Sequence, residues 1–206
     1  MCSSDLGESG NLNNEQFTIT SNDPTHLNGI QLVDAEVAGA HPWLSEGDLL
    51  ISMRFVNSVA ILDPQTRRIK WISTGTAFGP HSPRFYEGQA LCFDNRGGAE
   101  AAGGSQLVQI DLETRLPRVL FPQPSVPLPG SFYSSAAGYI DMGRSDRALI
   151  ALTFAQKIWE INLKTGEVLW EYISVDPQQH RRRLVQTARY VHEVSFPMNR
   201  EAGATP

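Results

Sequence analysis

The feature that most constrains this chain is a short pattern that occurs three times at nearly equal spacing. In each copy an apolar run ends in Asp or Asn, a Thr follows three residues later, and a second apolar run comes next; the copies begin at 59, 107 and 158. The Asp or Asn is Asp63, Asp111 and Asn162, so the copies lie 48 and 51 residues apart. Because such a side chain bonds the backbone just after it, each copy predicts a β-hairpin.

More strand-like segments precede each hairpin. Apolar runs lie at 48–54, 89–93 and 148–152, and further segments lie upstream of these at 25–33, 79–85 and 131–140. Four short strands per unit and a period near 50 residues are typical of the blades of a β-propeller. We therefore predict an all-β propeller fold with about three four-stranded blades, at roughly 22–75, 76–124 and 130–175. Three blades do not close a ring, so we expect further blades upstream.

The two ends of the chain differ from this pattern. We interpret residues 1–6 as a translated sequencing adapter joined to a truncated gene and exclude them from the fold, so that the partial propeller spans 7–175. In the tail, 176–206, Leu184, Ala188 and Val191 share one face at helical spacing after Asp176-Pro177. This predicts a C-terminal helix over Gln178–Val194, followed by a disordered end.

Composition excludes several classes of function. The net charge is −5 and no basic patch stands out in the sequence, which argues against nucleic acid as a partner. No apolar run approaches the length of a membrane span. Cys92 lies in an apolar stretch and is expected to be a buried structural thiol, and no cluster of metal-ligating residues is evident. The sequence does not indicate an oligomeric state.

Polar residues recur at the ends of the predicted strands. His26 and Asn28 precede the first apolar strand of their blade, and His81 lies in the corresponding segment of the next. Arg54 ends the strand at 49–53, and Asn95 follows the strand at 89–93. Since the innermost strands of a propeller line its central channel, we expect these side chains to meet at one end of it. Each also has a structural interpretation, as a hydrogen-bonded core histidine, a turn cap or an ion-pair partner.

The ordered set of motifs resembles the bacterial arylsulfotransferases that do not use a nucleotide sulfate donor. The resemblance covers residues from about 25 to 172, and its motifs are short. They are His26-Leu27-Asn28, Gly47-Asp48-Leu49-Leu50-Ile51-Ser52-Met53-Arg54, Val59-Ala60-Ile61-Leu62-Asp63-Pro64, His81-Ser82-Pro83, Phe93-Asp94-Asn95, Trp159-Glu160-Ile161 and Thr165-Gly166-Glu167-Val168-Leu169-Trp170-Glu171-Tyr172.

The resemblance implies a six-bladed parent and a ping-pong transfer of a sulfuryl group from an aryl sulfate to a phenol, without a metal or organic cofactor. His81 matches the histidine that attacks sulfur, and His26, Asn28 and Arg54 match the residues that hold the sulfuryl oxygens, with Asn95 as a further substrate-binding candidate. The resemblance also implies a periplasmic or secreted protein whose signal belongs to a lost N-terminus. One departure is Pro80, which stands where the family has Gln.

Two other functions stay open at this point. The first is a non-catalytic propeller that binds a ligand or serves as a scaffold, and the second is a hydrolase that uses the same histidines. Geometry distinguishes them: convergence of His26, Asn28, Arg54 and His81 favours the transferase, whereas a His81 ring directed into the core of a blade opposes it.

Overall fold

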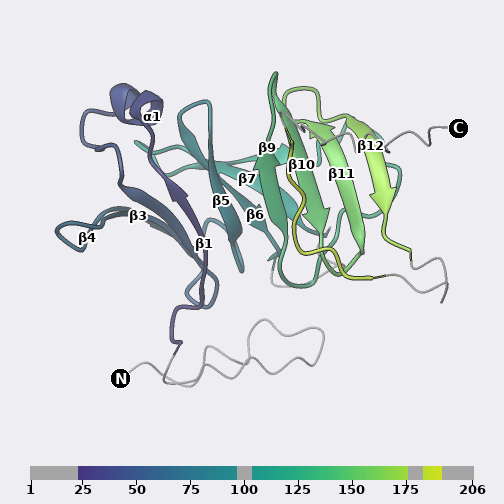
Figure 1. Cartoon of the computed structure of the whole chain (residues 1–206), viewed down its shortest axis with the longest axis horizontal. Coiled ribbons are helices and arrows are strands. Elements are labelled where there is room, and N and C mark those ends of the chain that lie inside the picture. The colour runs from purple at the N-terminus through teal and green to yellow at the C-terminus, as the bar shows by residue number, and fades with distance from the viewer. Residues whose placement is uncertain (1–22, 97–103, 176–182, 192–206) are drawn as a thin grey trace, which may run out of the picture.

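The computed structural model describes residues 23–96, 104–175 and 183–191, which form three four-stranded antiparallel sheets (Figure 1). The sheets are β1 (Leu27–Leu32), β2 (Leu49–Met53), β3 (Ser58–Asp63) and β4 (Arg68–Thr74); β5 (His81–Tyr86), β6 (Gln89–Asp94), β7 (Gln106–Ile110) and β8 (Pro117–Phe121); and β9 (Tyr139–Met142), β10 (Arg147–Leu152), β11 (Lys157–Asn162) and β12 (Val168–Ile173). Within each sheet, neighbouring strands follow one another in sequence. The predicted all-β propeller fold with three four-stranded blades is confirmed.

The repeated hairpin turns share one set of hydrogen bonds. Oδ1 of Asp63 accepts from the backbone N–H groups of the residues two and three positions on, at 2.8 and 3.1 Å. Asp111 does the same at 3.0 and 2.7 Å, and Asn162 at 2.9 and 3.0 Å. The recurring Asp or Asn in the sequence therefore reflects an identical turn between the third and fourth strands of every blade.

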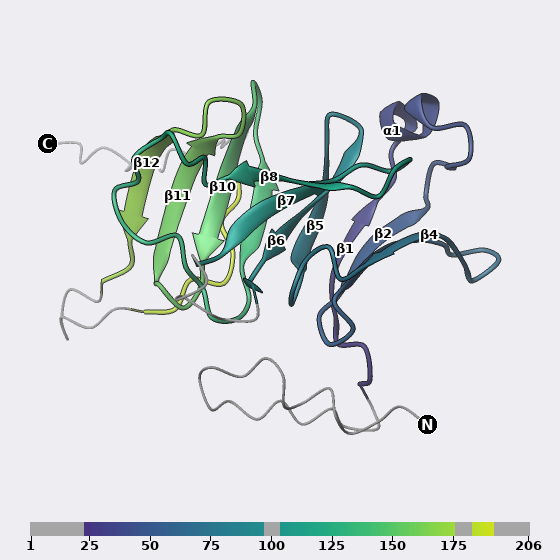
Figure 2. The ribbon, with the colours of Figure 1, turned by 180° about the vertical axis from the view of Figure 1, so that it is seen from behind.

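The blades stand side by side with their first strands adjacent (Figures 1 and 2). β1 lies beside β5, and β5 lies beside β9. A hydrogen bond of 2.9 Å from the backbone N–H of Ile140 to Oγ of Ser82 joins β9 to β5. These first strands are therefore the innermost strands, as at the axis of a propeller.

Two apolar cores lie between the blades. In the first, side chains from β2 to β4 pack against side chains from β5 to β7; its fully buried members include Leu50, Ile61, Cys92 and Ile110. The second joins the other face of the middle blade to the third blade, and its rings include Phe93, Phe121, Phe132 and Trp159. The middle blade is thus covered on both faces.

The other face of the first blade is buried at its centre and exposed at its sides. Strand register places Ile30, Ile51, Ala60 and Ile72 in one row across this sheet, on the face turned away from the second blade. Ile51 and Ala60, in the middle of the row, are only 5% and 0% exposed, whereas Ile30 is 54% exposed and Ile72 is 38% exposed. This face therefore has a core-like composition and two exposed isoleucines at its sides.

Two segments differ from the sequence expectations. A helix that was not predicted, α1 (Ala35–Ala40), follows β1 and is capped by the Asp34 carboxylate, which accepts from the N–H of Val37. In contrast to the helix predicted for Gln178–Val194, residues 183–191 form none.

This tail segment lies along the third blade, in yellow across β9 and β10 in Figure 1. The backbone N–H of Tyr190 donates to Asp141 at 2.8 Å, and its hydroxyl donates to Glu160 at 3.0 Å. These tertiary bonds hold the segment extended. The remainder of the predicted helix lies outside the described residues.

Candidate functional site

The imidazole of His81 stands at the start of β5, on the innermost strand of the middle blade. Its Nδ1 lies 2.8 Å from the carbonyl oxygen of Gly79, and only 8% of the residue is exposed. Because a carbonyl oxygen only accepts hydrogen bonds, Nδ1 carries the proton in this contact. Nε2 of the neutral ring therefore keeps its lone pair, which is the state required of a nucleophile.

Irregularities in the two innermost strands accompany these residues. β1 bulges between Leu27 and Gly29, and β5 bulges between His81 and Arg84, where Ser82 has a φ of +47°. A bulge adds a residue to one strand and turns side chains out of the regular alternation. Asn28 and His81 are thus displayed by strands that depart locally from sheet geometry.

The surroundings of His81 disfavour its protonation. The pKa of His81 is lowered from 6.5 to about 4, mainly by burial and to a smaller extent by the nearby charges of Arg54 and His26. The hydrogen bond to Gly79 and the nearby amide of Asn95 act in the opposite direction and favour the protonated ring. The ring is therefore neutral at neutral pH, and three of the predicted site residues act directly on it.

His26 and Arg54 both contact the ring of Phe55. The imidazole of His26 lies 4.7 Å from the ring of Phe55, centroid to centroid, and the guanidinium carbon of Arg54 lies 5.9 Å from the same centroid. Nδ1 of His26 contacts a carboxylate oxygen of Asp23 at 2.8 Å. Since a carboxylate accepts, Nδ1 of His26 is the donor, and Nε2 is the nitrogen left for other partners.

Asn28 uses both ends of its amide within the fold. Nδ2 donates to the carbonyl oxygen of Pro80 at 3.0 Å, and Oδ1 accepts from the hydroxyl of Ser52 at 2.6 Å. The contact with Pro80 ties β1 to the residue that immediately precedes His81. Asn28 therefore lies beside the loop that leads into His81, and both ends of its amide are engaged with the protein.

Asn95 is oriented by two backbone carbonyls of the segment before β9. Its Nδ2 donates to Ser134 and to Ala137, both at 2.7 Å, and only 2% of the residue is exposed. Oδ1 is buried and has no hydrogen-bond partner among the described residues. Because an amide oxygen is an acceptor, this unpaired end of the amide dipole suits a donor or a cationic ring rather than an oxyanion.

The structure thus brings the predicted residues together at one end of the first two blades. Sequence reasoning missed Asp23, Phe55 and Asn57, which contact this cluster. Asp23 had a local signal, because it lies three residues before His26. Asn57 lies in the turn between β2 and β3, where an Asn needs no functional explanation.

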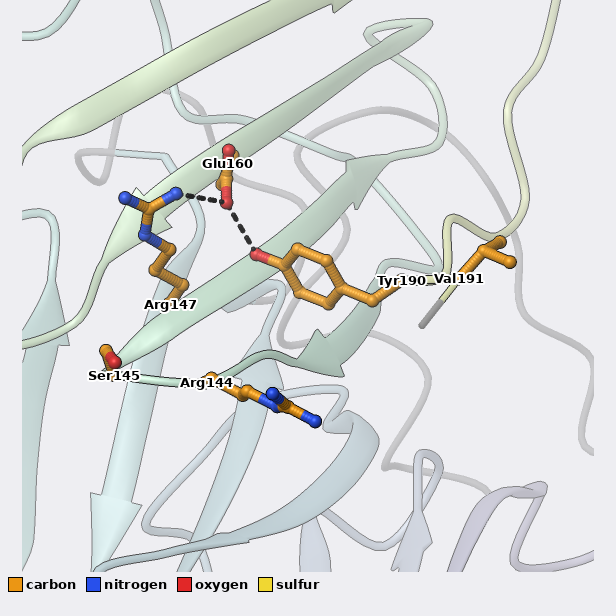
Figure 3. Close-up of a pocket in the computed structure, with 6 residues that line it drawn as sticks. All are labelled: Arg144, Ser145, Arg147, Glu160, Tyr190 and Val191. Carbon is orange, nitrogen blue, oxygen red and sulfur yellow. Dashed lines mark hydrogen bonds and ion pairs between the residues drawn. The ribbon is translucent and has the colours of Figure 1, made fainter. Parts of the chain in front are cut away.

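A cavity of about 420 Å³ lies elsewhere, between the tail segment and the third blade (Figure 3). Glu160 accepts there from the hydroxyl of Tyr190 and pairs with Arg147 at 3.4 Å, as the dashed lines show. The neighbouring Asp146 accepts from the hydroxyl of Tyr86, which is at the opposite end of β5 from His81. The cavity is therefore separate from His81 and its neighbours. The contacts of Glu160 beside it hold the tail segment against the third blade.

Two further properties concern only the described part of the chain. Within 23–96, 104–175 and 183–191, no group of three or more His, Cys, Asp or Glu side chains is placed to hold a metal ion. The same ranges contain no helix that is long and apolar enough to cross a membrane.

Comparison with known proteins gives one family match. A sequence model described as arylsulfotransferase (ASST) matches residues 5–121, which include the first two blades and the residues His26, Asn28, Arg54, His81 and Asn95. Comparison with curated protein sequences finds no match.

Solved structures of low sequence identity are also similar to the chain. The computationally designed protein Ika8 is 10% identical, with a TM-score of 0.43 over 78% of this chain and 38% of its own. BamB from Moraxella catarrhalis is 17% identical, with a TM-score of 0.35 over 61% and 33%. The β-propeller domain of Cps50 (Swd1) from Myceliophteria thermophila is 14% identical, with a TM-score of 0.43 over 72% and 42%. The chain thus spans less than half the length of each of these three structures.

Proposed function

The chain belongs to the arylsulfotransferase family, and we propose that it transfers a sulfuryl group from an aryl sulfate to a phenol through a sulfuryl-histidine at His81. The observation that carries the proposal is the contact of Nδ1 with Gly79, which leaves the lone pair on Nε2 of a neutral ring. A neutral imidazole is a competent nucleophile near pH 7 and divides one difficult transfer into two easier ones.

In the first step, Nε2 of His81 attacks the sulfur of the aryl sulfate. An N–S bond forms, the bond from sulfur to the phenolic oxygen breaks, and the electron pair leaves with the phenolate. The imidazole ring gains a positive charge because Nδ1 keeps its proton. The carbonyl of Gly79 and the unpaired Oδ1 of Asn95 both present negative dipole ends that stabilise this charge.

In the second step, the oxygen of an acceptor phenol attacks the same sulfur and the N–S bond breaks. The acceptor loses one proton and the departed phenolate gains one, so the overall reaction balances. His26 is our candidate for carrying this proton, because Asp23 occupies its Nδ1 and leaves Nε2 to exchange it.

The sulfuryl oxygens need donors, because charge collects on them in an in-line transfer of this kind. Arg54 supplies a planar fork of N–H groups close enough to His81 to affect its pKa. We assign the oxyanion role to Arg54, together with His26 when that ring is protonated. Asn28 and Asn95 contribute less to it, since their amides bond Ser52, Pro80, Ser134 and Ala137.

One observation favours a second candidate function, a propeller that binds a ligand or acts as a scaffold without catalysis. The 8% exposure of His81 suits a structural histidine as well as a nucleophile. His41 illustrates this alternative, because it is 7% exposed and its Nε2 contacts the carbonyl oxygen of Gly88 at 2.8 Å. A test must therefore separate a catalytic histidine from a structural one.

The test is the release of nitrophenol from 4-nitrophenyl sulfate, with and without phenol, by the wild type, His81→Ala and His41→Ala. The proposal expects phenol-dependent release that disappears in His81→Ala and persists in His41→Ala. Release without phenol would indicate a hydrolase. A folded wild type that is inactive toward a range of aryl sulfates would favour the binding propeller.

We also propose that the protein acts in the periplasm or outside the cell, as members of this family typically do. Fractionation of cells that express the complete gene tests this, and recovery of the protein with the cytoplasm would contradict it.

A further inference from the structure

The loop that leads into His81 is held at three consecutive backbone positions by side chains. Oδ1 of Asp94 accepts from the N–H of Phe78 at 2.8 Å, and Oδ1 of Asn57 accepts from the N–H of Gly79 at 2.8 Å. At the next residue, Nδ2 of Asn28 donates to the carbonyl oxygen of Pro80. The carbonyl of Gly79 lies between these anchored groups and is the acceptor for His81.

The two asparagines are themselves fixed by the first blade. Asn57 has a φ of +49° in the turn between β2 and β3. Its backbone N–H donates to the carbonyl oxygen of Arg54 at 3.3 Å, and its carbonyl oxygen accepts from the backbone N–H of Gly75 at 2.8 Å. Asn28 is fixed by the hydroxyl of Ser52. Both residues therefore transmit the position of the first blade to a loop of the second.

The loop depends on these anchors because glycine does not fix its own backbone. Gly79 has a φ of +62°, and glycine adopts positive and negative φ values about equally readily, so the residue alone does not set the direction of its carbonyl. A change in the orientation of its carbonyl would remove the acceptor of the Nδ1 proton. The proton could then move to Nε2, which would remove the lone pair from that atom.

We propose that Asn57 and Asn28 are positioning residues that hold the Gly79 carbonyl in place and thereby keep His81 in the tautomer with the proton on Nδ1. The value of this arrangement rests on the proposed function, in which Nε2 attacks sulfur. The tautomer itself is a property of the folded chain and exists with or without catalysis, so the two proposals can fail separately.

The hydrogen bonds predict different responses to the same isosteric change. Asn57→Asp keeps an oxygen that accepts from the N–H of Gly79, so the tautomer should be retained. Asn28→Asp replaces the donor to Pro80 with a second acceptor and sets two oxygens against each other, so the loop should shift. Asn57→Ala removes the anchor altogether.

The matched control is Asn162→Ala. Asn162 also holds two backbone N–H groups of a hairpin turn, but it lies in the third blade, where these groups belong to Lys164 and Thr165. Any general effect of losing an asparagine that stabilises a turn will appear in this variant as well.

The experiment is ¹⁵N NMR of the full chain with labelled histidine at pH 7, which distinguishes protonated from unprotonated ring nitrogens. His81→Gln assigns the His81 signals among the five histidines of the sequence. We expect an Nδ1–H ring in the wild type, Asn57→Asp and Asn162→Ala, and a shift towards Nε2–H in Asn57→Ala and Asn28→Asp. An unchanged tautomer in both of the last two variants, with the fold intact by amide spectra, would overturn the proposal.

Kinetics provide a second readout. In Asn57→Ala we expect kcat for aryl sulfate to fall by about a hundredfold, because small misplacements of a reacting group have effects of this size, while KM changes little. Asn57→Asp should restore most of the rate. If Asn57→Ala does not fold, Asn28→Asp alone tests the positioning role. The proposal predicts a change of the His81 tautomer in this variant, which the loss of a purely structural asparagine would not produce. A tautomer that shifts as expected in a protein without sulfuryl transfer would refute the proposed function and leave the positioning role intact.

Discussion

Gly29 on β1 packs so closely against Pro83 on β5 that a Cβ added to the glycine would lie 2.3 Å from Cδ of Pro83. The same Cβ would lie 2.8 Å from Oγ of Ser52. Because the proline ring is rigid and the backbone nitrogen of Ser82 would lie 3.1 Å from the same Cβ, β5 can make room only by moving as a strand. The two innermost strands of adjacent blades therefore require a glycine at this position.

Gly29→Ala should accordingly destabilise the chain by about 1–3 kcal/mol, the usual range for overpacking a closely packed site. Urea unfolding followed by tryptophan fluorescence measures the change. Gly39→Ala is the control, because a Cβ there meets nothing within 4 Å and the position lies in α1. Equal stability of the two variants would contradict the close packing of β1 on β5.

Acid sensitivity should arise from the repeated turns. Hydrogen bonds from the backbone and side chain of Thr66 lower the pKa of Asp63, and those from Thr114 lower the pKa of Asp111. A lowered folded-state pKa contributes stability above the unfolded-state value, and this contribution is lost as the pH falls through the folded-state value.

The double variant Asp63→Asn and Asp111→Asn should keep the turns, because blade three already uses Asn162 there, and should weaken the loss of stability below about pH 4. Unfolding midpoints at pH 7 and pH 3 for the wild type and the variant measure this. A variant that loses as much stability on acidification as the wild type would show that other groups control acid unfolding.

The fold could be predicted from the sequence because its signals are local. Each hairpin is specified by alternating strands and by an Asp or Asn that bonds the next few backbone amides. The tail could not be predicted in this way, because Tyr190 bonds Asp141 and Glu160, which are distant in sequence. These contacts override an apolar spacing that favours a helix.

The site was predictable as a group of residues but not in its roles. The position of His81, His26 and Arg54 at strand ends follows from the repeat. The direction of an amide does not, since the carbonyls of Ser134 and Ala137 decide which end of Asn95 faces His81. The anchoring role of Asn57 likewise depends on Gly79, 22 residues away.

The protonation of His81 should affect both stability and rate. Its folded-state pKa of about 4 lies below the ordinary 6.5, so the unfolded chain binds the extra proton between these values. The sign is therefore that stability falls as the pH drops from about 6.5 to about 4. Above this window the ring is neutral in both states.

His81→Gln should remove part of this pH dependence. An NMR titration of the His81 ring measures the pKa directly, and urea unfolding at pH 7 and pH 5 measures the linked stability. A His81 pKa near 6.5 in the folded wild type would contradict the burial seen here. For the proposed transfer, the rate limited by the nucleophile should decline only as the pH approaches about 4.

Arg54→Gln should have two separable effects. Removing a cation near the ring should raise the pKa of His81, because the Arg54 charge lowers it. Removing the donor fork should also reduce kcat for aryl sulfate by about a hundredfold or more, the usual effect of losing one donor to a developing anion. Arg115→Gln, an exposed arginine of the turn between β7 and β8, serves as the control for both measurements.

The three blades use corresponding strands for the same contact. In the second blade Ala90 and Cys92 of β6 face the first blade, and in the third blade Ala148 and Ile150 of β10 face the second. The matching position in β2 is Ile51, which is itself 5% exposed and lies in one row with the exposed Ile30 and Ile72 on the face of the first blade that is turned away from the second. This face therefore corresponds to the surface on which a neighbouring blade packs in the rest of the structure.

A contiguous apolar sheet face of this kind promotes association when nothing covers it. The chain in isolation should therefore self-associate with rising concentration, and Ile30→Gln with Ile72→Gln should shift its mass in light scattering towards the 22.8 kDa of one chain. Leu116→Gln is the control, because Leu116 is more exposed, at 68%, but lies in a turn outside this face. If Leu116→Gln reduced association as much as the double variant, general surface hydrophobicity would be responsible. A response confined to the double variant would identify this face of β1 to β4 as the surface that associates.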